Sequence, residues 1–213
     1  MRPTLRLATA GAGAGLNALI LLVPAALFGY LPVRDPGLVA AVAAVCVGVA
    51  VEIFCWMSAS GPLEAASKTD LDWLNWMQGL ALLASFEIDS LWRCVHPGAG
   101  GGWLVMGLGL LVCGALLRAA AILQLGSGFT NASMPGNPVL CVDGIYGRLR
   151  HPAELGLCLM VVGFAVALQV WIVAAVTLPL FLILSIIRVV REDRELARAF
   201  PDAFAAYRRR VRI

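Results

Sequence analysis

Residue types that bind charged groups of small molecules gather in the second half of the chain. Arg150 and His151 stand next to each other, and the acidic pair Glu192-Asp193 follows beyond one further apolar stretch. Guanidinium and imidazole groups suit anionic partners, whereas carboxylates suit cations and hydroxyls. Arg188 precedes Glu192 by four residues, so both side chains share one helix face. Taken alone, that spacing would equally describe an ordinary surface ion pair.

A long polar segment, from Gly126 to His151, separates two apolar runs. Connections of such length in compact proteins are usually functional. The segment contains Gly144-Ile145-Tyr146 and ends in Arg150-His151-Pro152, after which the chain becomes apolar at once. We therefore expect the segment to carry part of the functional site.

The order of these elements resembles that of the isoprenylcysteine carboxyl methyltransferases and the related phospholipid methyltransferases, a superfamily of integral membrane enzymes. Its pattern has an Arg and Leu-Gly after a span, then Leu-Val, Gly-x-Tyr and Arg-His-Pro-x-Tyr-x-Gly. After a last span come an Arg, an acidic pair, a Leu, and late aromatic and basic residues. The corresponding residues here are Arg118, Leu125-Gly126, Leu140-Cys141, Gly144 to Tyr146, Arg150 to Gly156, Arg188, Glu192-Asp193, Leu196, Phe200, Phe204, Tyr207 and Arg208 to Arg210.

The resemblance implies a methyltransferase that uses S-adenosylmethionine as donor and a lipophilic acceptor. It implies Arg188 as a substrate anchor beside a catalytic Glu192. The residues it implies for cofactor binding are Leu140, Cys141, Tyr146, Arg150, His151, Pro152, Glu154, Gly156, Glu192 and Asp193. Methyl transfer is an in-line displacement that needs no metal, and alignment of the reactants can supply about 7–11 kcal/mol of the barrier reduction.

Four positions depart from the superfamily pattern. Asp193 replaces a Glu, Pro201 a Gly and Phe204 a Tyr, while Glu154 replaces the Tyr that follows His-Pro. Glu154 has two readings. In the first turn of a helix, an acidic side chain is favoured by the helix dipole by about 0.3–1 kcal/mol. Alternatively, its carboxylate replaces the Tyr as a hydrogen-bond acceptor for the donor's ammonium or ribose.

Composition indicates a membrane protein. Hydrophobic residues make up 61% of the chain and charged residues 14%, with mean hydropathy +0.87, whereas soluble domains average about 45–50% and 25%. A membrane-spanning helix needs about 20 apolar residues. Apolar runs cover roughly 8–31, 36–58, 71–93, 102–124, 153–169 and 170–190. We predict an all-α, polytopic membrane helix bundle of about six transmembrane helices, whose last two form a tight pair turning near Gln169.

The predicted organisation has two parts. Residues 1–101 provide three N-terminal spans without a superfamily signal. Residues 102–213 form a methyltransferase-like membrane core with the loop 126–151 and a charged C-terminal helix 188–213. We interpret the first run as a retained span, because it is longer than the h-region of a secretory signal.

The basic residues predict the orientation. With the N-terminus in the cytoplasm, only Arg34 and Arg93 of the 16 Lys and Arg residues fall outside, in agreement with the positive-inside rule. Both termini are then cytoplasmic. Lys68 is the single lysine, a bias typical of GC-rich genomes, which favours a bacterial inner membrane.

Other ligand classes are not indicated. The cysteines form no CxxC pair, and the two histidines, His96 and His151, fall on opposite membrane faces. We expect neither a metal nor a nucleic-acid partner; the expected partners are membrane lipids and the lipophilic substrate. Glu52, Glu87 and Asp89 lie inside spans. They either line a polar cavity for a substrate head group, or they form interhelical hydrogen bonds or reach water at the span ends.

The acceptor's nucleophile stays open among carboxylate, thiol, amine and hydroxyl. A bacterial source favours a small lipophilic acceptor over a prenylated protein. Two alternative functions remain: a sterol-reductase-like enzyme that uses NADPH and shares an Arg-His-Pro-x-Tyr pattern, and a non-catalytic membrane scaffold, for which Glu154 is the main argument.

Overall fold

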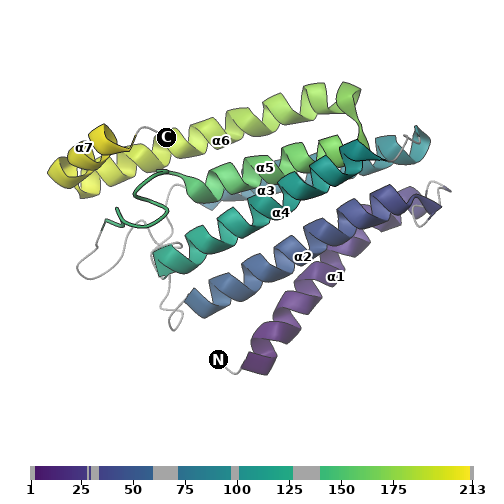
Figure 1. Cartoon of the computed structure of the whole chain (residues 1–213), viewed down its shortest axis with the longest axis horizontal. Coiled ribbons are helices and arrows are strands. Elements are labelled where there is room, and N and C mark those ends of the chain that lie inside the picture. The colour runs from purple at the N-terminus through teal and green to yellow at the C-terminus, as the bar shows by residue number, and fades with distance from the viewer. Residues whose placement is uncertain are drawn as a thin grey trace.

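A computed structural model describes residues 3–27, 29, 34–59, 72–96, 101–126 and 140–211. These residues form seven helices and no strand, which confirms the all-α prediction. In chain order the helices are α1 (Pro3–Leu27), α2 (Pro36–Ala59), α3 (Asp72–Val95), α4 (Gly102–Leu125), α5 (Pro152–Leu168), α6 (Trp171–Ala199) and α7 (Pro201–Arg210). Helices α2 to α6 run roughly along the long axis, α1 lies obliquely beside α2, and α7 lies at one end (Figure 1).

Each predicted apolar run corresponds to one long helix. By length and composition, α1, α2, α4 and α6 can each cross a membrane. Helix α5 is apolar but has only 17 residues, and α3 interrupts its apolar sequence with polar side chains such as Gln78 and Asp89. A membrane bundle is therefore supported, while the count of six spans stays a prediction.

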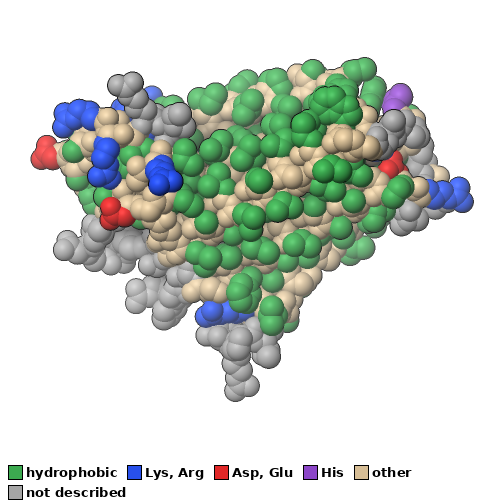
Figure 2. Space-filling view, in the orientation of Figure 1, with side chains coloured by type: hydrophobic (Ala, Val, Ile, Leu, Met, Phe, Trp, Pro, Cys, Tyr) green, Lys and Arg blue, Asp and Glu red, His purple; other side chains and the backbone are tan. Residues whose placement is uncertain are grey.

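The outer surface of the bundle is apolar between two charged ends. On α6, the side chains of Ile172, Val176, Leu180, Ile183 and Ile186 are each more than half exposed. Hydrophobic side chains cover the middle of the visible face, and charged side chains gather at its two ends (Figure 2). Such a surface suits hydrocarbon rather than water, in keeping with an integral membrane protein.

Glycines bring the backbones of α4 and α5 into direct contact. A Cβ atom on Gly107 would lie 2.3 Å from the backbone nitrogen of Ala167, and one on Gly114 would lie 2.5 Å from the carbonyl oxygen of Gly156. Small residues at helix interfaces allow this close approach in membranes. The packing fixes the start of α5 against Arg118 of α4, because a Cβ on Gly156 would lie 3.0 Å from the Arg118 nitrogen.

The end of the bundle farthest from α7 is closed by a buried ion pair. Arg93, only 3% exposed, lies 2.6 Å from Asp35 and donates to the Leu168 carbonyl at 3.0 Å. The next residue, Gln169, takes a left-handed conformation with φ of 57° and ends α5. The predicted turn near Gln169 is thereby confirmed, and the guanidinium holds α2, α3 and α5 together there.

The predicted charged helix 188–213 is divided in the structure. Helix α6 ends at Ala199 and α7 begins at Pro201, because a proline lacks the N–H that would continue the helix and its ring clashes with the preceding turn. Helix α7 then packs Phe204 and Tyr207 against Leu140 and Val142 of the preceding loop. Residues 212 and 213 lie outside the described residues.

Candidate functional site

Four polar side chains meet at the end of the bundle near α7. We call Arg150, His151, Glu192 and Asp193 the loop cluster. The Arg150 Nη1 atom lies 2.7 Å from Asp193 Oδ2, and His151 Nε2 lies 2.9 Å from Asp193 Oδ1. His151 Nδ1 lies 3.6 Å from Glu192 Oε2. These contacts arise because His151 directly precedes α5 while the carboxylates lie near the end of α6.

The loop cluster combines the Arg150 guanidinium and the His151 imidazole with two carboxylates. Burial lowers the pKa of His151, but the Glu192 and Asp193 carboxylates outweigh that effect and hold the pKa above its ordinary value. The Glu192 side chain stays 42% exposed, whereas those of His151 and Asp193 are largely buried. The cluster can therefore offer both signs of charge to a ligand approaching from its open side.

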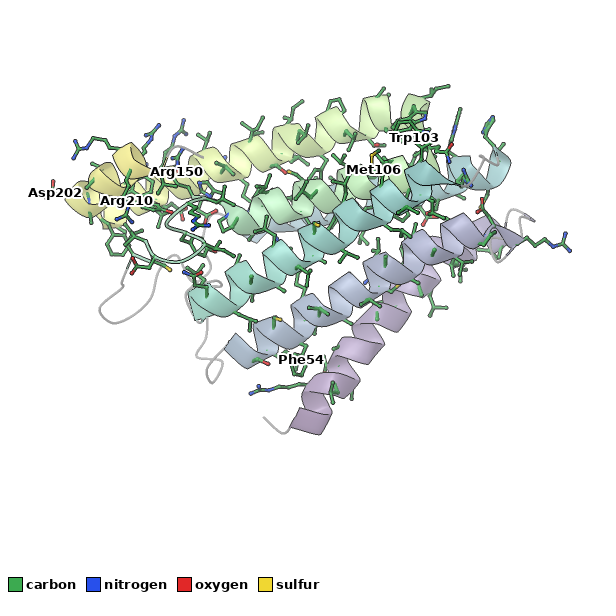
Figure 3. All side chains as sticks on the ribbon, in the orientation of Figure 1. Phe54, Trp103, Met106, Arg150, Asp202 and Arg210 are labelled. Atoms are coloured by element: carbon green, nitrogen blue, oxygen red, sulfur yellow. The ribbon has the colours of Figure 1, made fainter. Side chains whose placement is uncertain are left out.

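Helix α7 and Gln124 hold the loop that carries Arg150 and His151. The Tyr207 hydroxyl donates to the Tyr146 carbonyl at 2.7 Å, and Arg210 Nη2 donates to the Val142 carbonyl at the same distance. Figure 3 shows Arg150 and Arg210 at this end of the molecule. Burial raises the pKa of Tyr207 to about 12, so its phenol stays protonated and able to donate.

Gln124 at the end of α4 fixes the other side of this loop. Its Nε2 donates to the Asp143 carbonyl at 2.6 Å, and its Oε1 accepts from the Ile145 N–H at 3.0 Å. Gly144 has φ of 55°, and a Cβ atom there would lie 2.5 Å from Gln124 Nε2. Only glycine fits this turn without strain, which explains the Gly of the Gly-Ile-Tyr motif.

A second set of polar side chains lies between α3, α5 and α6. We call Gln78, Glu154, Ser185 and Arg188 the interhelical cluster. Gln78 Nε2 donates to Glu154 and, at 3.0 Å, to Ser185. Arg188 Nη1 donates to Gln78 Oε1 at 2.6 Å, and Arg188 Nε lies 3.8 Å from Glu154 Oε2. Gln78, Glu154 and Ser185 are all buried, at 1%, 8% and 3% exposure.

Arg118 joins three helices beside these clusters. Its guanidinium contacts both carboxylate oxygens of Glu52, at 2.8 and 2.7 Å, and donates to the Ala153 carbonyl at 3.1 Å. The pair links α2, α4 and the first turn of α5. Of the two readings of Glu52, the structure therefore shows the interhelical one.

The remaining predicted site residues lie around the loop cluster without joining it. Leu140 packs against Phe204 and Tyr207, and Cys141 Sγ lies 3.8 Å from Gln124 Nε2. Pro152 is the first residue of α5. Gly156 lies at the contact with α4, where a Cβ would be 2.6 Å from the Gly114 carbonyl, so helix packing accounts for this glycine.

Two residues of the interhelical cluster were not predicted from the sequence. Gln78 lies in α3, for which no motif exists, and Ser185 lies in the apolar part of α6. The only available signal was a polar side chain inside an apolar helix, which in a membrane requires a partner. Of the predicted loop, residues 127–139 lie outside the described part of the chain.

The region that holds most of these contacts is similar to known proteins. The family described as phospholipid methyltransferase matches residues 103–203. The chain is also similar to the protein-S-isoprenylcysteine O-methyltransferase of Schizosaccharomyces pombe, with 30% identity over 108 residues. Both matches support the membrane methyltransferase superfamily. The aligned part covers 49% of this chain and 45% of the yeast protein, so the chain spans less than half of that relative. No solved structure matches the chain.

The phospholipid methyltransferase match extends from α4 into α7. It contains the whole loop cluster and, from the interhelical cluster, Glu154, Ser185 and Arg188. Gln78 and Glu52 lie outside it, on α3 and α2. The N-terminal helices of this chain therefore complete contacts that begin in the superfamily region.

Proposed function

We propose that the protein is an S-adenosylmethionine-dependent integral membrane methyltransferase acting on a lipophilic acceptor. The observation that carries the proposal is the loop cluster, which sets Arg150 and His151 against Glu192 and Asp193 inside the superfamily region. The donor carries a carboxylate, an ammonium, a sulfonium and ribose hydroxyls. A site for it needs both cationic and anionic side chains close together.

The chemistry of the loop cluster fits this donor. Arg150 and His151 can bind the donor's carboxylate, because the guanidinium is always charged and the protonated form of His151 is favoured. Glu192, with its exposed carboxylate, suits the ammonium or a ribose hydroxyl. The donor supplies the activated methyl group, and the side chains bind and orient it.

The acceptor side of the proposed site is the interhelical cluster. Arg188 lies one turn before Glu192 on α6, a rise of about 6 Å, so one rigid helix carries a residue of each cluster. Arg188 contacts buried groups of α3 and α5, and its side chain stays 22% exposed, so we propose that a lipophilic molecule reaches it from the bilayer. Holding both reactants in line can supply about 7–11 kcal/mol of the barrier reduction.

The proposal includes an orientation. The loop cluster and α7 face the cytoplasm, where a water-soluble donor is available, and both termini lie on that side of a bacterial inner membrane. The positive-inside distribution of arginine supports this arrangement.

Calorimetry on the detergent-solubilised protein tests the proposal. S-adenosylhomocysteine, the product form of the donor, is expected to bind with one site per chain, and NADPH is expected not to bind. Stabilisation by NADPH without any response to S-adenosylhomocysteine would instead identify a reductase-like protein. Absence of binding by both would favour the scaffold alternative.

A further inference from the structure

We infer that Glu154 is the proton acceptor of the transfer reaction and that the methyl acceptor is a lipophilic phenol rather than a carboxylate. The inference rests on the proposed methyltransferase function and adds to it the class of acceptor. Glu154 stands where the superfamily pattern has a Tyr.

The Glu154 carboxylate is directed into the bundle. Glu154 lies in the first turn of α5. The N-cap residue of this helix, His151, makes no side-chain capping hydrogen bond. The partners of Glu154 are Gln78 of α3 and Arg188 of α6, and Glu154 is only 8% exposed. A helix-dipole contribution does not require such burial, because an exposed carboxylate in the first turn already gains about 0.3–1 kcal/mol.

The pairing of Arg188 argues against a carboxylate acceptor. A buried carboxylate needs a cationic partner, and Arg188 is the cation of the interhelical cluster. Arg188 already lies 3.8 Å from Glu154 and donates to Gln78 Oε1. The nearby Arg118 is bound by Glu52 through both carboxylate oxygens. An acceptor carboxylate at Arg188 would therefore lie beside the Glu154 carboxylate without the ammonium and sulfonium that accompany the donor's carboxylate at the loop cluster, and like charges in a buried site strongly disfavour each other.

A hydroxyl acceptor is uncharged, so it can bind beside both Glu154 and Arg188 without repulsion. Its oxygen lone pair attacks the donor's methyl carbon, the carbon–sulfur bond breaks, and the bonding electrons remain on sulfur as the neutral thioether. The hydroxyl proton moves to a Glu154 oxygen, so the positive charge of the sulfonium and the negative charge of Glu154 are both neutralised. A carboxylate acceptor carries no proton at neutral pH and needs no base.

Among hydroxyls, a phenol matches a carboxylate base best. A phenol titrates near pH 10, whereas the pKa of water, close to that of alkyl alcohols, is about 15.7. The Arg188 guanidinium beside Glu154 stabilises the phenolate charge that develops during transfer. An alkylammonium would have to lose a proton first and would meet the positive charge of Arg188. An aryl amine is uncharged at neutral pH, but its nitrogen would develop positive charge beside Arg188 as it attacks the methyl carbon.

Gln78 is a positioning residue for this base. Its Nε2 donates to Glu154 Oε1 and its Oε1 accepts from Arg188, so one amide orients both side chains. Ser185 accepts a second N–H of the same amide at 3.0 Å. Since Gln78 lies outside the superfamily match, the orientation of Glu154 is supplied by a helix with no counterpart in that match.

Three acceptors with one chain length test the inference in the full-length protein with radiolabelled donor. They are para-decyloxyphenol, para-decyloxybenzoate and para-decyloxyaniline. We expect methylation of the phenol, with the benzoate and the aniline each at least about tenfold slower, a difference of about 1.4 kcal/mol. A preference for the benzoate or the aniline, or no transfer to the phenol by protein that binds S-adenosylhomocysteine, would overturn the inference and leave the proposed function standing.

Glu154→Gln keeps the shape of the side chain and removes the base. Loss of a general base typically costs about 10²–10⁴-fold in rate, so phenol methylation should fall about hundredfold while S-adenosylhomocysteine affinity stays within about twofold. Glu87→Gln is the matched control, since both Glu87 oxygens are buried in α3 and, among the described residues, have no hydrogen-bond partner. Unchanged phenol turnover in Glu154→Gln would contradict the inference. If this variant does not fold, the comparison of the three acceptors with the wild-type protein still tests the inference.

Discussion

Arg188 and Glu192 lie one turn apart on α6 yet belong to different clusters. Arg188 donates to Gln78 of α3 at 2.6 Å, whereas Glu192 lies 3.6 Å from His151 at the start of α5. Their i,i+4 spacing alone would suggest a mutual surface pair. The structure instead shows one helix that links the proposed donor and acceptor sides.

Substitution of these two residues should therefore have separable effects. Arg188→Ala should leave S-adenosylhomocysteine affinity within about twofold but lower acceptor turnover by about tenfold or more, because removing one partner of a desolvated charged contact costs about 2–5 kcal/mol. Glu192→Ala should weaken S-adenosylhomocysteine binding by about tenfold or more. Calorimetry and a methyl-transfer assay on both variants measure the difference. Asp202→Asn, which neutralises an exposed carboxylate of α7, serves as control; equal loss of donor affinity in Arg188→Ala would show that its role is misassigned.

His151 should make stability depend on pH. Its pKa is raised in the folded protein by Glu192 and Asp193 against the effect of burial. The contribution of His151 to folding stability is therefore fully present below its unfolded-state pKa of about 6.5. It is lost as the pH rises through the higher pKa of the folded state. We expect the Tm difference between the wild type and His151→Gln to be larger at about pH 6 than at about pH 9. A difference that grew with pH would mean that burial dominates and that the imidazole is neutral in the folded state.

Glycine packing between α4 and α5 should be intolerant of a single methyl group. Gly114→Ala would place Cβ 2.5 Å from the Gly156 carbonyl, and such overpacking typically costs about 1–3 kcal/mol. Gly109→Ala on the same helix is the matched control, because a Cβ there meets no other atom within 4 Å. Thermal unfolding in detergent should show a lower Tm for Gly114→Ala only. Equal Tm values would mean that the two helices separate easily.

Much of this arrangement could be predicted because it depends on local signals. The apolar runs correspond to the six long helices, and the turn near Gln169 follows from two adjacent runs. The resemblance assigned Arg150, His151 and the acidic pair to one cofactor site, and the structure brings these side chains into contact. The division of the C-terminal helix at Pro201 was not predicted. A proline weakens a helix but does not always end it, since α6 continues through Pro179.

The interhelical cluster could not be predicted in the same way. Gln78 precedes Glu154 by 76 positions and Arg188 by 110, and no periodicity links positions so distant. The two readings of Glu154 from the sequence considered only its own helix and the donor. Its partner on α3 becomes visible only when α3, α5 and α6 pack together, because the amide of Gln78 has no motif around it.

Membrane topology can be tested directly with reporter fusions. We expect fusions after Arg34 and after His96 to report the outside, and fusions after Lys68 and at the C-terminus to report the cytoplasm, because the basic residues favour that side. Lys68 lies outside the described residues, so its fusion tests the sequence prediction alone. A C-terminus that reports the outside would separate α7 and the loop cluster from a cytoplasmic donor and would contradict the proposed orientation.

Replacing Glu154 by the superfamily residue should change the choice of acceptor. In Glu154→Tyr, the carboxylate beside Arg188 is gone, so the guanidinium becomes available to an acceptor carboxylate. We expect para-decyloxybenzoate methylation to rise by about tenfold, or about 1.4 kcal/mol, and phenol methylation to fall, because a tyrosine with a pKa near 10 is a poor proton acceptor at neutral pH. Gln78 then loses its anionic partner but can still accept from Arg188. The ratio of the two initial rates, measured at saturating donor, reports the switch independently of the amount of folded protein. A ratio unchanged from that of the wild type would show that Glu154 does not select the acceptor.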